Sequence, residues 1–169
     1  DSNICHIFVK RSIPQVINIV DTKTVTHLIG ALARYADKLR SEGLSAAEIV
    51  EKVQSMREKQ VVYAGLQTLE YLYKGGRLSR TSAAVGSIAN IKPIITINTE
   101  GKVDSFAKAI GVKRAIATIV KNMQNDEIDP DFPVWTICTV DNENCEALEA
   151  ALSDAGVTVS GRMQVGPTI

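Results

Sequence analysis

The sequence is poor in aromatic residues and in the residue types that most often bind metals. Aromatic side chains make up 5% of the 169 residues, so a folded core has to be built mainly from aliphatic side chains. The only two histidines are His6 and His27, and Cys5 beside His6 is not accompanied by a second pair at ligand spacing. The sequence therefore predicts no metal site.

Motifs of enzymes and nucleotide-binding proteins are also missing. The glycine pair Gly75-Gly76 belongs neither to a P-loop nor to a dinucleotide fingerprint, because no Gly-Lys-Ser/Thr and no Gly-x-Gly-x-x-Gly occurs. No Ser-His-Asp set can be assigned from residues scattered along the chain. We therefore expect no cofactor and no self-contained catalytic activity.

Charge, cysteine content and hydrophobic runs narrow the function classes further. Nineteen basic residues balance nineteen acidic ones, so a nucleic acid or a membrane surface is not an expected partner. The longest apolar region, residues 83–97, is interrupted by Asn90, Lys92 and Pro93, and no run reaches the length of a membrane span. The three cysteines include no Cys-x-x-Cys pair, which favours free thiols in a reducing cytosol. With no visible signal peptide, we expect a cytoplasmic protein.

What the sequence does contain is an alternation of strands and helices, which predicts an α/β fold with a mixed sheet and flanking helices. Ser45 and Glu48 form a capping box, a specific signal for the start of a helix. Asp21 or Thr22, and later Asp141 or Asn142, are expected to cap two further helices. The predicted helices cover residues 24–41, those after Ser45, a short apolar stretch from Leu66, and residues 111–123 and 142–155. The predicted strands cover residues 16–20, 60–64, 91–98, 103–107, 134–140 and 157–165, with a hairpin turn at Thr99–Lys102.

The most informative stretch runs from Leu69 to Ser79. Gly75 is placed to end a short apolar helix, since glycine accepts a left-handed conformation, and Gly76 lets another group approach the backbone closely. Arg77 then follows on a tight turn, where its guanidinium could bind a carboxylate through two parallel hydrogen bonds. From the residues alone, an ion pair between Arg77 and an internal Asp or Glu is the preferred interpretation, and only a family resemblance reverses that preference.

This stretch, continued through Asn90-Ile91-Lys92-Pro93-Ile94-Ile95, resembles the DegV family of bacterial fatty-acid-binding proteins, which includes the lipid-holding subunit of fatty-acid kinase. The resemblance covers about residues 19–169 and implies the C-terminal part of a two-domain protein. Residues 1–65 would then be a remnant of the first domain, with a strand and two helices, and residues 66–169 a C-terminal domain. The resemblance also implies a non-catalytic module that holds a long-chain fatty acid for a kinase partner. The ligand-binding residues that it implies are Gly75, Gly76, Arg77 and Ser79.

Three departures from the family pattern accompany the resemblance. The Ser and Thr motifs of the first domain have no counterpart in this sequence. The sequence ends at Gly166-Pro167-Thr168-Ile169, where relatives continue through a Gly-Thr-His segment, and His27 does not match that head-group histidine. Relatives often carry Lys-x-Arg after the hairpin, whereas this chain has Lys108-Ala109-Ile110.

Two functions from different classes follow. The chain is either a lipid-binding module or a truncated structural or interaction domain that has lost the ligand. The small, apolar residues 81–89 are either a packed helix or a smooth wall along an acyl chain. An exposed apolar groove in such a fragment would promote self-association, so a homo-oligomer is also expected.

Overall fold

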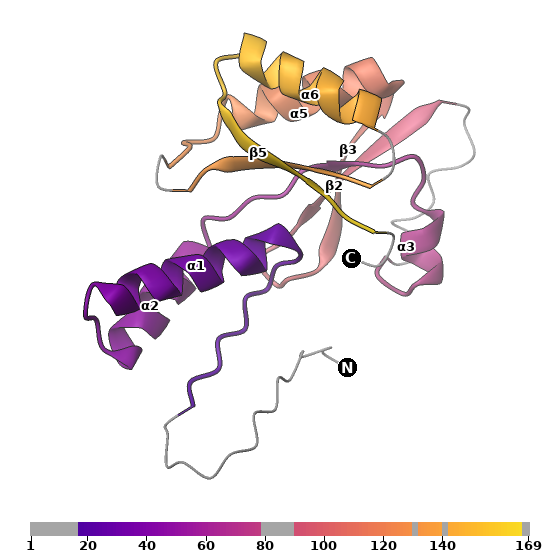
Figure 1. Ribbon diagram of the computed structural model, residues 1–169. Helices are drawn as coiled ribbons and strands as arrows, with labels where there is room; N and C mark the ends of the chain where they lie inside the picture. The colour runs from indigo at the N-terminus through magenta and orange to yellow at the C-terminus, as the bar shows by residue number, and fades with distance from the viewer. Residues whose placement is uncertain (1–16, 79–89, 130–131, 140–141, 167–169) are drawn as a thin grey trace. The chain divides into compact units, whose positions relative to one another are not determined.

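The computed structural model describes residues 17–78, 90–129, 132–139 and 142–166 (Figure 1). The chain divides into two compact units, residues 1–60 and residues 61–169. Helices α1 and α2 belong to the first unit, and all strands together with α3, α5 and α6 belong to the second. The assignment of residues 1–65 to a first domain and of residues 66–169 to a second stays a prediction.

The first unit contains two helices that pack together, α1 (His27–Ser41) and α2 (Ala46–Arg57). Helix α1 ends where predicted, and Gly43 reverses the chain with a φ of 88°, a left-handed value that favours glycine. The capping box is confirmed, since the Glu48 N–H donates to Ser45 Oγ at 3.4 Å and the Ser45 N–H donates to Glu48 Oε2 at 2.8 Å. Both helices are therefore settled by local sequence signals.

The segment before α1 does not follow the prediction. Residues 17–20 form no strand, and Ile17 and Ile19 are 78% and 72% exposed. A strand needs a hydrogen-bonding neighbour, and the part of the chain that the structure describes provides none for this run. Asp21 does not cap α1 either, because its Oδ1 accepts a hydrogen bond from the Lys23 N–H at 3.0 Å in a local turn. The N-cap position is Thr26, without a side-chain hydrogen bond.

The second unit contains a three-stranded antiparallel sheet in the order β1-β2-β3. Its strands are β1 (Ala64–Gly65), β2 (Ile91–Ile97) and β3 (Val103–Ile110). The predicted hairpin is confirmed: the Asn98 N–H donates to the Lys102 carbonyl at 2.9 Å, and Gly101 has a φ of 79°. The strand predicted at residues 60–64 is reduced to Ala64–Gly65, because only these residues pair with β2.

A second sheet in the same unit consists of two parallel strands. Strand β4 (Val134–Cys138) pairs with β5 (Val159–Gln164), and α6 (Asn142–Asp154) connects them. The predicted α/β class is confirmed, with the antiparallel and the parallel pairings in two separate sheets. Asp141, one of the two expected caps for this helix, lies outside the described residues.

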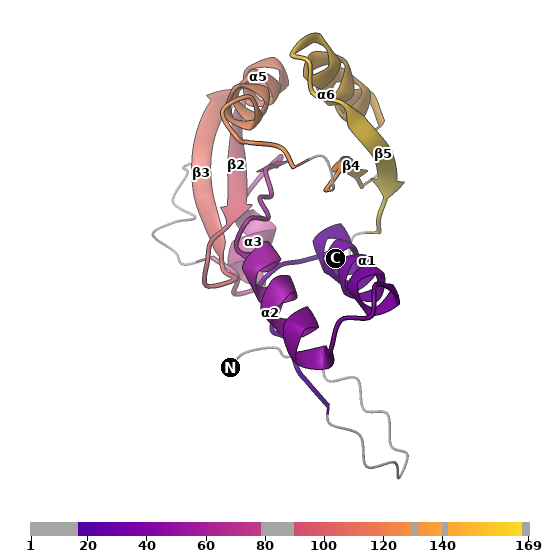
Figure 2. The same ribbon diagram turned by 90° about the vertical axis from the view of Figure 1, so that its left-hand side faces the viewer.

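Helix α5 (Val112–Met123) joins the two sheets through its packing. Its Ile119 lies in one core cluster with Ile94 of β2, which is fully buried, and Val120 lies in another with Leu152 of α6, which is 1% exposed. Figure 2 shows α5 and α6 next to each other, with α5 alongside β2 and β3 and α6 alongside β5. Two clusters of the aliphatic core predicted from the composition are thus built on these two helices.

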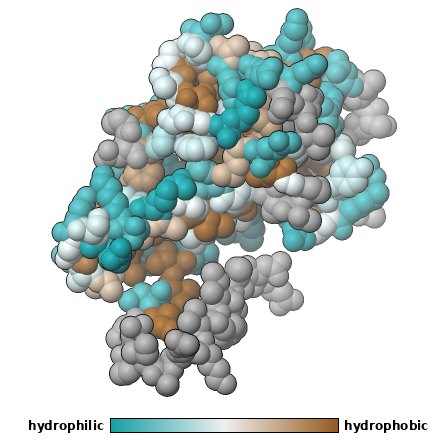
Figure 3. Space-filling view, viewed as in Figure 1, coloured by the Kyte–Doolittle hydropathy of each residue, from teal (hydrophilic) through white to brown (hydrophobic). Residues whose placement is uncertain are grey.

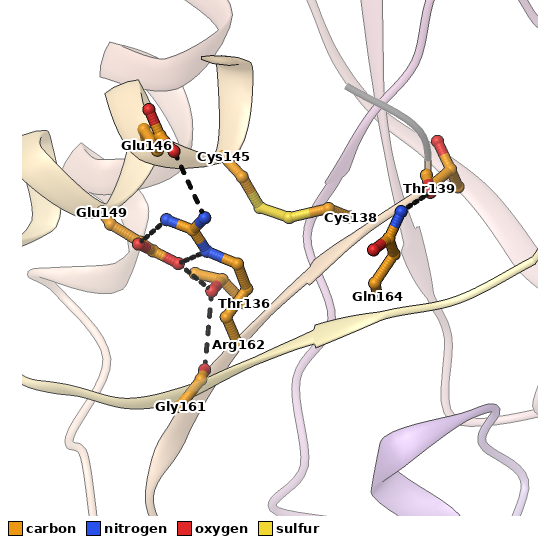
Figure 4. Close-up of a disulfide and its surroundings, with 9 residues drawn as sticks. All are labelled: Thr136, Cys138, Thr139, Cys145, Glu146, Glu149, Gly161, Arg162 and Gln164. Carbon is orange, nitrogen blue, oxygen red and sulfur yellow. Dashed lines mark hydrogen bonds and ion pairs between the residues drawn. A yellow bond between two sulfur atoms is a disulfide. The ribbon is translucent and has the colours of Figure 1, made fainter. Parts of the chain in front are cut away.

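The expectation of free thiols is wrong for two of the three cysteines. Cys138, the last residue of β4, forms a disulfide with Cys145 in the first turns of α6 (Figure 4). Their Cα atoms are 6.2 Å apart, a separation that disulfides commonly span. The sequence alone does not show this pairing, because it depends on how α6 packs against β4. Cys5 lies outside the described residues.

Candidate functional site

The predicted glycine turn follows a short helix, α3 (Glu70–Lys74), that is anchored to the first sheet. Leu69 and Leu78, one on each side of this helix, are 3% and 8% exposed and pack with Ile95 of β2. The Thr68 Oγ1 accepts a hydrogen bond from the Glu70 N–H at 3.1 Å at the start of the helix. Buried residues on both sides therefore hold the turn at residues 75–77 in a defined place.

The turn itself is a Schellman motif, with its left-handed residue one position later than predicted. The Arg77 N–H donates to the Leu72 carbonyl at 2.8 Å, and the Gly76 N–H donates to the Tyr73 carbonyl at 2.9 Å. Gly76 has a φ of 71°, whereas Gly75 has an ordinary helical φ of −78°. The prediction that Gly75 takes the left-handed conformation is therefore wrong, and Gly76 has that role. A Cβ on Gly75 would still lie only 3.1 Å from the Tyr71 carbonyl oxygen, so both positions favour glycine.

Arg77 is exposed at the end of this turn. Its Nη1 donates a hydrogen bond to the Gly75 carbonyl oxygen, which folds the guanidinium back over the turn. Within the described ranges, no Asp or Glu forms an ion pair with Arg77. The structure thus brings three of the four predicted site residues together, and Ser79 lies outside the described residues, as do residues 81–89.

A nearby polar pair escaped the sequence analysis. The Lys92 Nζ on β2 donates to the Gln67 Oε1, which lies just before α3. The backbone joins the same two segments, because the Leu66 N–H donates to the Pro93 carbonyl at 2.9 Å. No local signal marks this pair, since 25 positions separate the two side chains.

A charged contact with several hydrogen bonds lies elsewhere in the second unit, between α6 and β5 (Figure 4). Arg162 donates to both carboxylate oxygens of Glu149, one of them through Nε at 2.8 Å, and lies 3.5 Å from Glu146. The Thr136 hydroxyl donates to the same Glu149 carboxylate. The pKa of Glu149 is lowered to about 2, mainly by the hydrogen bonds from Arg162 and to a lesser extent by the one from Thr136.

This contact shows that Arg162 is already bound to a carboxylate of the protein itself. An open groove runs beside it, lined by residues 156–162 together with Glu149 and Ser153. The basic side chain in that groove, Arg162, already makes a two-pronged contact with Glu149. Arg77, which has no such carboxylate among the described residues, is therefore the better candidate for binding an external carboxylate.

His27 lies in the first unit and is buried. It is 7% exposed, and its Nε2 lies 3.1 Å from the Arg34 Nη2. Burial and, to a lesser extent, the Arg34 charge lower the pKa of the imidazole. Elsewhere in the described part of the chain, no three His, Cys, Asp or Glu residues gather as a metal site, and no helix has the length and hydropathy to cross a membrane.

Comparison with known proteins identifies the family. The family model DegV, whose description reads "Uncharacterised protein, DegV family", matches residues 6–169. The match therefore begins before residue 19, the expected start of the sequence resemblance. A DegV domain-containing protein of Caldanaerobacter subterraneus is 37% identical over 152 residues, covering 89% of this chain and 54% of the relative. Another, of Clostridium perfringens, is 34% identical over 131 residues, covering 75% and 45%.

A solved structure agrees with these relatives. The crystal structure of a fatty acid binding DegV family protein of Streptococcus agalactiae superimposes with a TM-score of 0.79 at 30% identity, covering 88% of this chain and 52% of the other. The chain thus spans about half the length of the relatives that it matches. On the sequence match and the shared fold, this chain belongs to the DegV family.

Proposed function

We propose that the chain binds a long-chain fatty acid, with the carboxylate near Arg77. The observation that carries the proposal is the exposed Arg77 on the hydrogen-bonded Gly75-Gly76 turn, without an internal carboxylate partner in the described part of the chain. The fatty-acid-binding relative of Streptococcus agalactiae, 30% identical over 88% of this chain, supports the same ligand class.

The chemistry follows from the charge of the ligand. A fatty-acid carboxylate loses part of its hydration when the acyl chain leaves water, and a fixed guanidinium offsets that loss with charge-assisted hydrogen bonds. Gly75 and Gly76 have no side chains, so a head group can approach the turn. Ser79, two residues beyond Arg77, is proposed as a further ligand-binding residue because its hydroxyl can donate a hydrogen bond.

We further propose that the bound fatty acid is presented to a kinase subunit, so that this chain itself is a non-catalytic, cytoplasmic accessory module. Family membership supports the binding role. A kinase that phosphorylates the carboxylate would need the head group, and not the acyl chain, to face the partner. A carboxylate at the exposed Arg77 meets that requirement.

The experiment compares Arg77→Ala with Lys74→Ala for the retention of oleate or palmitate, measured by native mass spectrometry and by titration calorimetry. Lys74 is a matched control because it is a nearby cation that is already paired with Glu70. A hydrogen bond to a charged group contributes about 1.5–3 kcal/mol, so Arg77→Ala should weaken binding roughly tenfold or more. Lys74→Ala should leave binding unchanged.

Two further measurements distinguish a binding role of Arg77 from a structural one. Arg77→Lys should restore binding only in part, because an ammonium cannot make the two-pronged contact. A fatty alcohol of equal length should bind the parent and Arg77→Ala equally well. A large fall in melting temperature of Arg77→Ala, with unchanged fatty-acid retention, would assign Arg77 to the fold instead.

A further inference from the structure

A buried disulfide links the end of β4 to the first turns of α6 (Figure 4). Cys138 is the last residue of the strand and is 5% exposed, and Cys145 is near the start of the helix and is 6% exposed. Seven positions separate them, so the bond closes a small loop and constrains only the short connection between strand and helix. What the bond controls is therefore the start of α6.

Other contacts hold the remainder of α6 without help from the disulfide. One turn beyond Cys145, the Glu149 carboxylate accepts hydrogen bonds from Arg162 of β5 and from Thr136 of β4. Further along, Leu152 is 1% exposed and packs with Val120 of α5. Breaking the disulfide should therefore leave α6 docked on both strands and free only its first turn.

The same contacts keep the two sulfur atoms close to each other after reduction. Glu149 fixes the helix relative to β5, and Cys138 is held by the hydrogen bond from the Val165 N–H to its carbonyl oxygen, at 2.9 Å. Two thiols that are held side by side by the fold re-form their disulfide readily, because closure costs little additional chain entropy. This geometry favours re-formation of the bond whenever an oxidant is present.

We propose that Cys138 and Cys145 form a reversible dithiol–disulfide pair. The first turn of α6 is ordered when the surroundings oxidise the pair and becomes less ordered when they reduce it. The oxidant is a low-molecular-weight disulfide such as oxidised glutathione. Both cysteines are buried, so exchange takes place when the freed first turn of α6 opens and exposes one of them. The thiolate of that cysteine attacks a sulfur of the small disulfide, forming a mixed disulfide and releasing one small thiol. The thiolate of the other cysteine then attacks the protein sulfur of the mixed disulfide, which forms the protein disulfide and releases the second small thiol. Two protein thiols are oxidised with loss of two protons, and the small disulfide is reduced to two thiols.

The pair lies at the carboxyl edge of the parallel sheet. Cys138 ends β4, and the Gln164 side chain at the end of β5 donates to the Thr139 carbonyl at 3.4 Å just beyond it. In parallel α/β sheets, ligands bind outside the carboxyl ends of the strands. Loosening the first turn of α6 would therefore alter the edge of the parallel sheet at which both strands end.

The test equilibrates the whole chain in glutathione buffers of increasing reducing strength, quenches it with acid and counts free thiols by maleimide labelling and mass spectrometry. Cys138 and Cys145 should become labelled together, in one transition that depends on the square of the glutathione concentration. Hydrogen exchange of the reduced chain should speed up about tenfold or more for amides 143–146, with amides 148–154 unchanged. A pair that stays oxidised until the chain unfolds would overturn the proposal, and so would two thiols that stay reduced in oxidised glutathione.

Substitutions test whether the labelling transition comes from Cys138 and Cys145. Cys5→Ser should keep the transition, and Cys138→Ser combined with Cys145→Ser should abolish it. Glu149→Gln removes the charge that anchors α6, so its transition should move to a more oxidising glutathione ratio while circular dichroism stays unchanged. An unchanged transition in Glu149→Gln would contradict the argument that this anchor holds the thiols together.

Discussion

At the scale of single residues, burial and close approach decide which positions tolerate change. Ile95 shows the first case, since it is 8% exposed and lies in a core cluster with Leu69 and Leu78. Gly161 shows the second, since a Cβ at this position would lie 2.7 Å from the ring of Trp135 on the neighbouring strand. Both effects follow from side-chain volume and charge, so each can be tested by one substitution with a matched control.

Ile95→Asp should unfold the second unit. A buried carboxylate without a partner costs several kcal/mol, on the order of the total stability of a domain. Ile110→Asp is the matched control, because Ile110 on the adjacent strand is 59% exposed and the same carboxylate there stays hydrated. Thermal unfolding followed by circular dichroism compares the two. If Ile95→Asp melts like the parent, Ile95 is not part of the core.

Gly161→Ala should destabilise the parallel sheet by about 1–3 kcal/mol, because the added methyl group forces the Trp135 ring or the strand to move. Gly166→Ala introduces the same methyl group where no atom of the described residues lies within 4 Å of the new Cβ. It should be neutral or slightly stabilising, since alanine has less freedom than glycine in the unfolded chain. Urea unfolding of both variants, monitored by Trp fluorescence, measures the difference, and equal midpoints would refute the predicted clash.

At the scale of secondary-structure elements, α6 is joined to the parallel sheet by a charged contact as well as by apolar packing. The Glu149 carboxylate on the helix accepts from Arg162 on β5 and from Thr136 on β4. Since Arg162 is 33% exposed and Glu149 is 24% exposed, the contact is partly shielded from water. It should therefore resist salt better than the exposed pair Arg40–Asp37 on α1, whose side chains are 71% and 70% exposed.

This contact predicts a specific dependence of stability on pH. Hydrogen bonding lowers the pKa of Glu149 from its ordinary 4.5 to about 2, so the ionised carboxylate stabilises the folded state above pH 4.5. That contribution should fall as the pH drops from about 4.5 towards 2. The free-energy difference between the parent and Glu149→Gln, from urea unfolding, should be largest near pH 7 and should shrink in acid. A difference that stays constant from pH 7 to pH 2 would contradict the assignment.

At the scale of the whole molecule, apolar side chains remain at the surface of both units. Ile17 and Ile19 before α1 are exposed, as is Tyr71 of α3 at 74%. In Figure 3, brown and teal residues are interspersed over the face shown, and brown residues reach the surface in several places. Because the chain spans about half the length of its relatives, the ligand and the partners of a whole family member stay proposals for this chain.

We predict that the chain self-associates, because exposed apolar side chains gain by mutual burial. Multi-angle light scattering over a range of concentrations should show dimers or larger species. Ile17→Ser combined with Ile19→Ser removes two of the most exposed aliphatic side chains and should shift the distribution towards the monomer. A parent chain that is strictly monomeric at high concentration would exclude this behaviour.

Local features of the fold could be predicted because short segments determine them. The Ser45–Glu48 capping box, the hairpin at Thr99–Lys102 and helix α5 each depend on residues within a few positions of one another. The glycine turn was also predictable, apart from the one-residue shift of the left-handed position to Gly76. The position of Arg77 on that turn follows directly, and its proposed role depends on a ligand that the fold alone does not identify.

The sequence by itself thus determined the α/β class, most helices, the hairpin and the place of the glycine turn, because helical periodicity, caps and turn glycines act within a few residues. Only the tertiary structure decided the contacts between distant elements. Cys138 contacts Cys145 only because α6 packs against β4, and Arg162 contacts Glu149 only because α6 also packs against β5. The same reason explains the failed strand at residues 17–20: a run of aliphatic residues favours a strand, but only a neighbouring strand can supply its hydrogen bonds.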